Sequence, residues 1–109
     1  MENQMSIFDY IQPEYPDINT ITEAEMVSII GKATGLTFVR DKFLEDWRAK
    51  YKGCVISIEY LNYKTYDERN GKRFISVEVE YKTSGIGSPC DNIEEAIGRI
   101  KKGIERFVK

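Results

Sequence analysis

The sequence predicts an α+β fold in which a long antiparallel β-hairpin packs against a C-terminal helix and two N-terminal helices, with a third short strand as a further option. Residues 73–83 alternate apolar and polar side chains, which is the pattern of a strand with one buried face. Residues 91–108 carry isoleucines three and four positions apart, which is the pattern of an amphipathic helix. Thr22 and Glu25 stand three positions apart ahead of an apolar run, as in the capping box that opens many helices.

The length of the chain, 109 residues, predicts one domain spanning 1–109. Its composition, 41% hydrophobic and 31% charged, is ordinary for a globular protein. No stretch approaches the roughly 18 apolar residues of a membrane span, and the acidic N-terminus lacks the basic start and apolar run of a signal peptide. We therefore expect a cytoplasmic protein without a membrane partner.

The N-terminal part is predicted to be mainly helical. The segment IFDYIQ, which follows Ser6, forms a short helix that two prolines end, so that residues 12–20 form a loop. A stronger helix covers about 23–34, with Gly35 in the left-handed position that closes many helices. Residues 36–39, with the sequence LTFV, form either a connector or a brief strand.

A further helix is expected over about 41–51. Asp41 is a suitable cap for its start, and Gly53 follows its end. Four apolar or aromatic side chains then share one face, because they are spaced by one, three and four positions. They are Phe43, Leu44, Trp47 and Tyr51.

Residues 54–66 and 73–83 form the two strands of the predicted hairpin. The Asn-Gly pair at 70–71 stands between them, and type I′ turns favour this pair because both central positions need a positive φ. A two-residue turn at this place fixes a register in which the numbers of paired residues sum to 141, so that Tyr60 faces Tyr81. The hairpin is then long, and its tip projects beyond the core.

The stretch TSGIGSPCDNIEE, residues 83–95, is predicted to join the second strand to the C-terminal helix of about 91–108. Its glycines and cysteine raise the alternatives of an anion-binding loop or a nucleophile. A dinucleotide loop needs a third glycine and a phosphate loop needs a lysine, and both are missing. Asp91 adds a negative charge where an anion would lie. We therefore expect a structural turn, with Ser88 or Asp91 as the N-cap and Cys90 facing the core.

The chain contains no histidine, which excludes Ser-His-Asp and Cys-His catalysis and histidine-ligated metals. We predict no catalytic residue, no cofactor and no metal site. If the protein is an enzyme, Cys90 is its conspicuous nucleophile. The predicted register brings Cys54 close to Cys90, and in the cytosol both are expected to stay reduced. Glu78 and Glu80 form a carboxylate pair that suits acid–base chemistry, but a solvated strand face explains them better.

A basic and aromatic cluster at the hairpin tip is the first candidate for partner binding. Lysine and arginine side chains contact phosphates and tyrosine rings stack on bases, so the cluster suits nucleic acid as well as protein. The alternative is that its charges keep an exposed hairpin soluble and protect its edge. A pI of about 5.2 argues against a general nucleic-acid binder. The candidate residues are Tyr63, Lys64, Tyr66, Arg69, Lys72 and Arg73.

The acidic N-terminal part is the second candidate. Residues 1–31 hold six acidic residues and no lysine or arginine, whereas the rest of the chain holds 16 basic and 12 acidic residues. These two parts face either different partners or each other. An acidic surface suits a basic groove on another protein, such as a nucleic-acid channel, and the alternative is an ordinary solvated helix face. The candidate residues are Asp9, Glu14 and Asp17.

The block YDERNGKRFISVEVEYKTSGIGSPCDNIEEAI, about 30 residues long, resembles segments of small proteins encoded on prophages and conjugative elements of Firmicutes. Proteins of this type include anti-CRISPR inhibitors. The resemblance implies an inhibitor that binds a Cas nuclease or its guide-RNA complex, and it assigns no functional residue. The residues alone indicate a non-catalytic intracellular binding module, with a nucleic-acid-binding accessory protein of a mobile element as the alternative.

Overall fold

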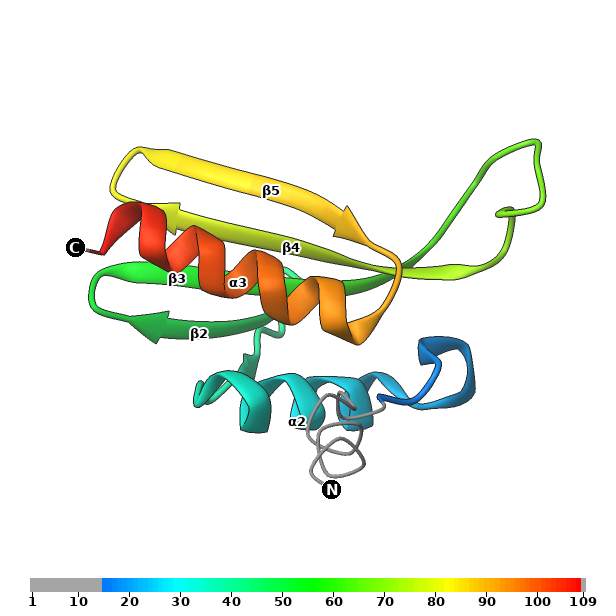
Figure 1. Ribbon diagram of the computed structural model, residues 1–109, viewed down its shortest axis with the longest axis horizontal. Helices are drawn as coiled ribbons and strands as arrows, with labels where there is room; N and C mark the ends of the chain where they lie inside the picture. The colour runs from blue at the N-terminus through cyan, green and yellow to red at the C-terminus, as the bar shows by residue number, and fades with distance from the viewer. Residues whose placement is uncertain (1–14, 109) are drawn as a thin grey trace, which may run out of the picture.

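A computed structural model describes residues 15–108 and contains a five-stranded antiparallel sheet with two α-helices (Figure 1). The strands lie in chain order across the sheet, and each is antiparallel to the next. The predicted α+β class is therefore confirmed, although the hairpin is only the centre of a larger sheet. The elements are η1 (Ile18–Thr20), α2 (Glu23–Thr34), β1 (Val39–Arg40), β2 (Trp47–Tyr51), β3 (Cys54–Asn62), β4 (Arg73–Tyr81), β5 (Ser84–Cys90) and α3 (Ile93–Phe107).

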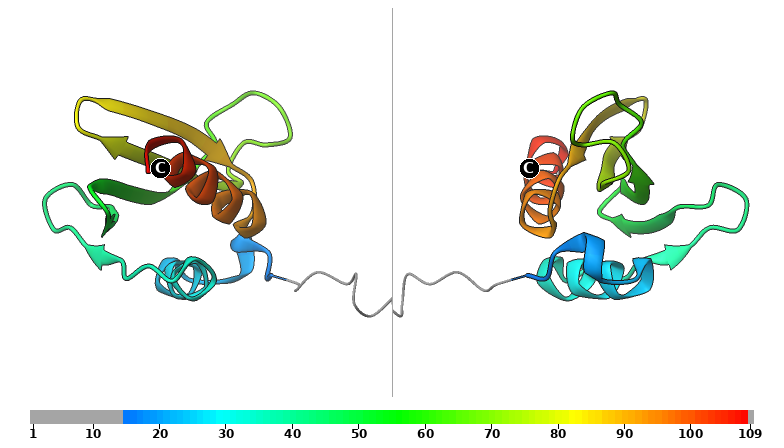
Figure 2. Two further views of the ribbon diagram at one scale, coloured as in Figure 1. Left: turned by 60° about the vertical axis from the view of Figure 1, so that its left-hand side comes forward. Right: turned by 90° about the vertical axis from the view of Figure 1, so that its right-hand side faces the viewer.

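The sheet has one apolar and one polar face, because side chains alternate along each strand. In β3 the residues Ile56 and Ile58 are buried, and in β4 so are Val77 and Val79. These side chains pack with those of α2 and α3 in one cluster, so both helices cover the same face, which we call the inner face (Figure 2). The opposite face, which we call the open face, carries mainly polar side chains.

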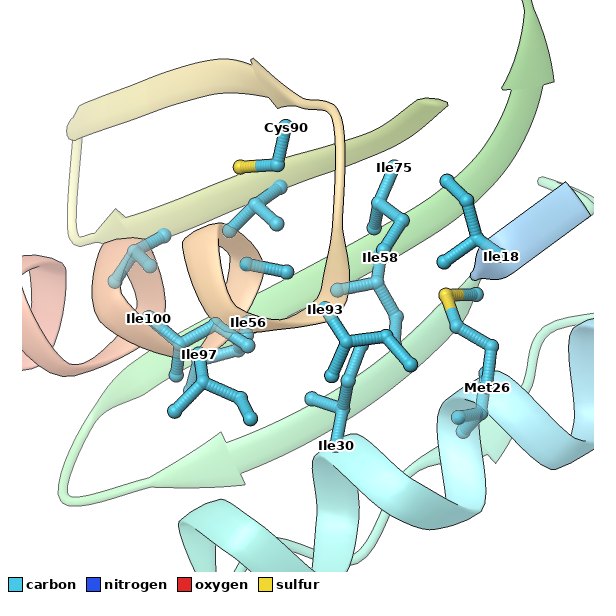
Figure 3. Packing of buried hydrophobic residues seen from close by; sticks show 14 of the residues in the cluster. Ile18, Met26, Ile30, Ile56, Ile58, Ile75, Cys90, Ile93, Ile97 and Ile100 are labelled. Atoms are coloured by element: carbon cyan, nitrogen blue, oxygen red, sulfur yellow. The ribbon is translucent and has the colours of Figure 1, made fainter. Parts of the chain in front are cut away.

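Helix α3 lies against β4 on the inner face (Figure 3). Each of its fully buried isoleucines stabilises the fold by roughly 1.5–3 kcal/mol. Gly103 marks a very close approach, since a Cβ at this position would lie 2.6 Å from Cγ2 of Val79. The Phe107 ring stacks on Tyr81 with 5.8 Å between the centroids. The expectation that the C-terminal helix docks on the hairpin is confirmed. The buried residues of α3 are Ile93, Ala96, Ile97, Ile100 and Gly103.

Helix α2 begins with the predicted capping box. The Thr22 hydroxyl accepts a hydrogen bond from the Glu25 backbone N–H, and the Glu25 carboxylate accepts one from the Thr22 backbone N–H, both at 3.1 Å. The helix ends at Gly35 with a φ of 75°, as expected. Trp47 links β2 to α2, because its Nε1–H donates to Oε2 of Glu23 over 2.6 Å.

Two expectations concern the chain ahead of α2. The predicted IFDYIQ helix lies outside the described residues. The described part of the predicted 12–20 loop contains the short 3-10 helix η1, and its Ile18 is buried in the core. Across residues 15–108, no helix combines the length and the apolar character that a bilayer crossing requires.

The predicted helix over 41–51 is wrong, because its capping residue starts only one turn. The Asp41 carboxylate accepts hydrogen bonds from the N–H groups of Phe43 and Leu44 at 2.9 and 2.8 Å. Glu45 then has a φ of 58°, which a right-handed helix cannot continue. The chain turns back into β2, whose backbone pairs with β3 along its whole length. Strand pairing therefore overrides a helical spacing of apolar residues.

A tight turn that the sequence prediction missed joins β2 to β3. Lys52 and Gly53 have φ values of 46° and 87°, and two positive values are typical of a type I′ turn. Gly53 adopts this conformation without strain because it has no Cβ. The turn lets Tyr51 pair directly with Cys54.

The central hairpin has a different register from the predicted one. Paired residue numbers in β3 and β4 sum to 135 rather than 141, so that Tyr60 faces Ile75. The difference of six positions is an even number, and side chains alternate with a period of two. Every side chain of the two strands therefore keeps its predicted face while it changes its partner.

The register differs because the Asn-Gly pair at 70–71 does not form a two-residue turn. Gly71, with a φ of 84°, donates its N–H to the Tyr63 carbonyl, and Tyr63 donates its own N–H to the Lys72 carbonyl. Two residues thus oppose one, which is a β-bulge. Strand β3 ends at Asn62 instead of 66, and a loop over 63–72 connects it to β4.

The predicted turn within residues 83–95 is also wrong, since most of this stretch is strand β5. It pairs with β4 from Ser84 to Cys90. Helix α3 is capped by Asn92, whose Oδ1 accepts a hydrogen bond from the Glu95 N–H at 2.8 Å, and not by Ser88 or Asp91.

The glycines of β5 make room for neighbouring side chains. A Cβ on Gly85 would lie 3.1 Å from Cγ of Glu80, and a Cβ on Gly87 would lie 3.1 Å from Cγ of Glu78. The two glutamate side chains therefore lie over β5 on the open face. The glycines serve strand packing where the sequence suggested a turn.

The two cysteines are buried free thiols that lie far apart. Cys54 pairs with Tyr81 and Cys90 pairs with Ile75, six residues away along β4, which is about 20 Å of strand. The predicted closeness of the cysteines is wrong because it depended on the wrong register.

The two glycines inside α3 provide a matched test of how closely the helix packs on the sheet. Gly103→Ala should destabilise the fold by about 1–3 kcal/mol, because its methyl group would overlap Val79. Gly98→Ala should stabilise it by about 0.5–1 kcal/mol, because no other group lies within 4 Å of the added Cβ and alanine favours helix. Urea denaturation measures both changes, and a Gly103 variant as stable as the Gly98 variant would contradict the packing.

Candidate functional site

The loop over 63–72 projects from the sheet and holds most of the residues predicted to bind a partner (Figure 1). Its tip is ordered by Asp67. Oδ1 of this carboxylate accepts hydrogen bonds from the Thr65 hydroxyl at 2.8 Å and from the Arg69 N–H at 2.9 Å. The Arg69 guanidinium adds an ion pair at 2.9 Å, and these bonds hold the pKa of Asp67 well below its usual range. The tip is therefore a structured turn.

Aromatic contacts fix the base of the loop. The rings of Tyr63 and Phe74 lie 4.5 Å apart, and the Arg69 guanidinium lies 5.3 Å from the Tyr63 ring. The Tyr63 hydroxyl donates a hydrogen bond to Asp91 just ahead of α3, which raises the pKa of Tyr63. On the other side, Asn19 of η1 accepts a hydrogen bond from the Arg73 N–H at 3.0 Å. Both sides of the loop are therefore tied to the rest of the fold.

Some of the predicted site residues contact other side chains of the protein, and the others face solvent. Tyr63 and Arg69 are engaged within the loop, and the Arg73 guanidinium lies 4.6 Å from the ring of Tyr60 on β3. The remaining three side chains are exposed, and Tyr66 is as exposed as in an extended peptide. They are Lys64, Tyr66 and Lys72.

The charge of the loop is weaker than its lysines and arginines suggest. Residues 63–73 contain four basic side chains, but Asp67 and Glu68 offset two of them and leave a net charge of +2. Proteins that follow a nucleic-acid backbone typically neutralise several phosphates, and their affinity depends on that number. A net charge of +2 therefore favours a protein partner over nucleic acid.

The acidic N-terminal candidates are described only in part. Asp9 and Glu14 lie outside the described residues. Asp17 caps η1, because its Oδ1 accepts hydrogen bonds from the Asn19 backbone and side chain at 2.8 and 3.0 Å. These bonds, with a smaller contribution from Lys72, lower the pKa of Asp17. Here, and where Glu23 of α2 forms an ion pair with Arg40 at 3.7 Å, the acidic and basic parts of the chain face each other.

The structure exposes an apolar cluster that the sequence prediction buried. Phe43 and Leu44, at the tip of the β1–β2 connection, are 95% and 53% exposed, and Val39 is 65% exposed. The incorrect helix over 41–51 placed the first two on a packed face. Alternation of Trp47 and the following residues was the signal for a strand here, and it would have left Phe43 in a turn.

Cys90 lacks the surroundings of a catalytic nucleophile. The side chain is 1% exposed and faces α3 in the core (Figure 3). Burial, with a smaller contribution from the carboxylates of Glu95 and Asp91, raises the pKa of the thiol from 9.0 to about 11. The thiolate is the reactive form of cysteine, so this thiol is inert near neutral pH.

A groove of about 500 Å³ between α2, β2 and the segment joining α2 to β1 also carries little chemistry. Its walls are small and apolar side chains such as Ala24, Val27 and Leu36. Lys32 is the one titratable residue in its lining. The groove therefore offers no acid–base pair.

The buried thiol predicts a specific pH dependence of stability. Because the pKa of Cys90 is higher in the folded than in the unfolded state, the contribution of the thiol is complete below about pH 9 and is lost as the pH rises toward about 11. The stability difference between the wild type and Cys90→Ala should therefore shrink by about 2 kcal/mol between about pH 8 and pH 11. Urea denaturation under reducing conditions measures it, and a constant difference would contradict the assignment.

Comparisons of the chain with protein families, with curated proteins and with solved structures found no match.

Proposed function

We propose that this chain is a non-catalytic binding protein that binds a protein partner through the loop over 63–72. The observation that carries the proposal is the arrangement of this loop: a fixed base and tip that present Lys64, Tyr66 and Lys72 to solvent. An isolated aromatic side chain flanked by cations is the kind of group that dominates the energy of many protein interfaces.

Order in the loop favours binding. Association costs the entropy of every side chain and loop that becomes fixed in the complex. The Asp67–Arg69 pair and the Tyr63–Phe74 contact already fix the loop in the free protein. The exposed Tyr66 thus contributes its contact area with a small entropic cost.

The resemblance of residues 66–97 to small proteins of mobile elements suggests a Cas nuclease, or its complex with guide RNA, as the partner to test first. Binding of such an effector would make the protein an inhibitor of the anti-CRISPR type. Residues 66–72 of the loop belong to this stretch, which begins at Tyr66.

The test is affinity capture of purified Cas effectors, with and without guide RNA, followed by a DNA-cleavage assay. Capture should be accompanied by inhibition of cleavage. Tyr66→Ala should weaken binding about 30-fold or more, since loss of a central aromatic costs about 2 kcal/mol. The charge reversal Lys64→Glu with Lys72→Glu should also weaken it.

Two further variants serve as controls. The reversal Lys101→Glu with Lys102→Glu changes the net charge equally at exposed positions of α3 and should leave capture unchanged. Phe43→Ala tests the exposed cluster of the β1–β2 connection. If Phe43→Ala abolished capture while the loop variants did not, the contact surface would be that connection and the loop would be excluded. Absence of capture and of inhibition would reject a Cas effector.

Nucleic acid is the second candidate partner, favoured by the exposed Lys64 and Lys72 beside Tyr66. Binding of single-stranded or duplex oligonucleotides should then weaken steeply with salt and depend on both lysines. Salt-insensitive or absent binding would remove this candidate.

A further inference from the structure

The open face of the sheet contains a small polar pocket between β3, β4 and Asp46, the residue just ahead of β2, and the proposed function does not use it. Its volume is about 40 Å³. Because Ser57 pairs with Glu78 and Glu59 pairs with Ser76, hydroxyl and carboxylate groups alternate across the two central strands. The lining residues are Asp46, Ser57, Ile58, Glu59, Ser76 and Glu78.

Ser57 is the unusual member of this pocket. Its side chain is 7% exposed, and its Oγ has no hydrogen-bond partner among the described residues. A buried hydroxyl without a partner costs about 1–3 kcal/mol. An unsatisfied oxygen that lines a pocket therefore indicates a donor supplied from outside.

The carboxylates of the pocket point to a cation as that donor. Asp46 already pairs with Arg48 at 3.1 Å, but the ion pairs formed within residues 15–108 include neither Glu59 nor Glu78. Partial burial, followed by the charges of Asp46 and Glu78 and by smaller contributions from two further glutamates, raises the pKa of Glu59. The pocket thus holds excess negative charge that the described residues do not neutralise.

We propose that this pocket receives the side-chain ammonium group of a lysine on a partner protein. A volume of about 40 Å³ is close to the roughly 30 Å³ of a water molecule, which is similar in size to an ammonium group. An ammonium group has three N–H donors, which match Ser57 Oγ and the carboxylates of Glu59 and Glu78.

Other cations fit less well. The planar guanidinium of arginine is larger than an ammonium group and prefers a flat, bidentate approach to one carboxylate. Within residues 15–108, no group of three or more acidic or cysteine side chains converges closely enough to hold a metal ion. A lysine also reaches the pocket from solvent, because the open face carries neither α2 nor α3 (Figure 2).

The test is a titration of the full chain, labelled with ¹⁵N, with the capped tripeptide Gly-Lys-Gly followed by NMR. Saturable shifts should be centred on the amides of Ser57, Glu59 and Glu78. The peptide with an acetylated lysine should not bind, and the arginine peptide should bind at least about tenfold more weakly. Arginine binding of equal strength would overturn the proposal, because it would indicate a general attraction to negative charge.

Matched variants separate the pocket from the charge of the face. Ser57→Ala should weaken lysine binding about tenfold or more, since a hydrogen bond to a charged group is lost, and should leave the melting temperature equal or higher. Glu78→Gln should weaken binding similarly, whereas Glu80→Gln, on the same strand and face but outside the pocket, should change it less than about twofold. Equal effects of the two glutamate variants, no effect of Ser57→Ala, or tighter binding of Mg²⁺ than of the peptide would each reject the site.

Discussion

The contact between α3 and β4 is the constraint on which the rest of the structure depends. Gly103 lets the helix approach Val79 so closely that no side chain fits between them. The helix therefore lies along the sheet and buries its isoleucines on the inner face, and α2 completes the same core. The buried hydrophobic cluster is gathered on the inner face, so the open face and residues 64–72 lie outside it. Both proposed binding sites lie in these regions.

The faces of the elements could be predicted from the sequence, whereas their partners could not. Burial alone produces the alternation in 54–62 and 73–81 and the isoleucine spacing of α3. Because burial affects every position of an element, these patterns show which side chains face the core. The register depended on one local signal, the Asn-Gly pair at 70–71. That signal failed because the Asn70 side chain accepts a hydrogen bond from the Thr65 N–H and Gly71 forms a bulge. The observed and predicted registers differ by six residues, an even number, so each side chain stayed on its predicted face of the sheet.

The strands at the sides of the sheet were missed for a related reason. Residues 41–51 have both a helical spacing and an alternation, and the deciding hydrogen bonds to β3 form only because a tight turn at Lys52 and Gly53, which the prediction missed, folds β3 back onto β2. In β5 the glycines and proline resemble a turn, but a neighbouring strand pairs with them and makes glycine useful. The candidate residues of the loop were predicted from their composition. The bonds by which Asp67 holds Arg69, and the unsatisfied hydroxyl of Ser57, became visible only in the folded structure.

The separation of the 63–72 loop from the core has a consequence for how such a protein changes over generations. The fold holds this loop through a few groups at its base, chiefly Tyr63 and its contacts with Phe74 and Asp91. Residues 64–70 make no contribution to the buried cluster of the inner face. Substitutions at the solvent-facing Lys64 and Tyr66 therefore change the contact surface while the inner core and the hydrogen bonds around Asp67 stay in place. Under the proposed function, recognition of a partner can therefore change faster than the fold.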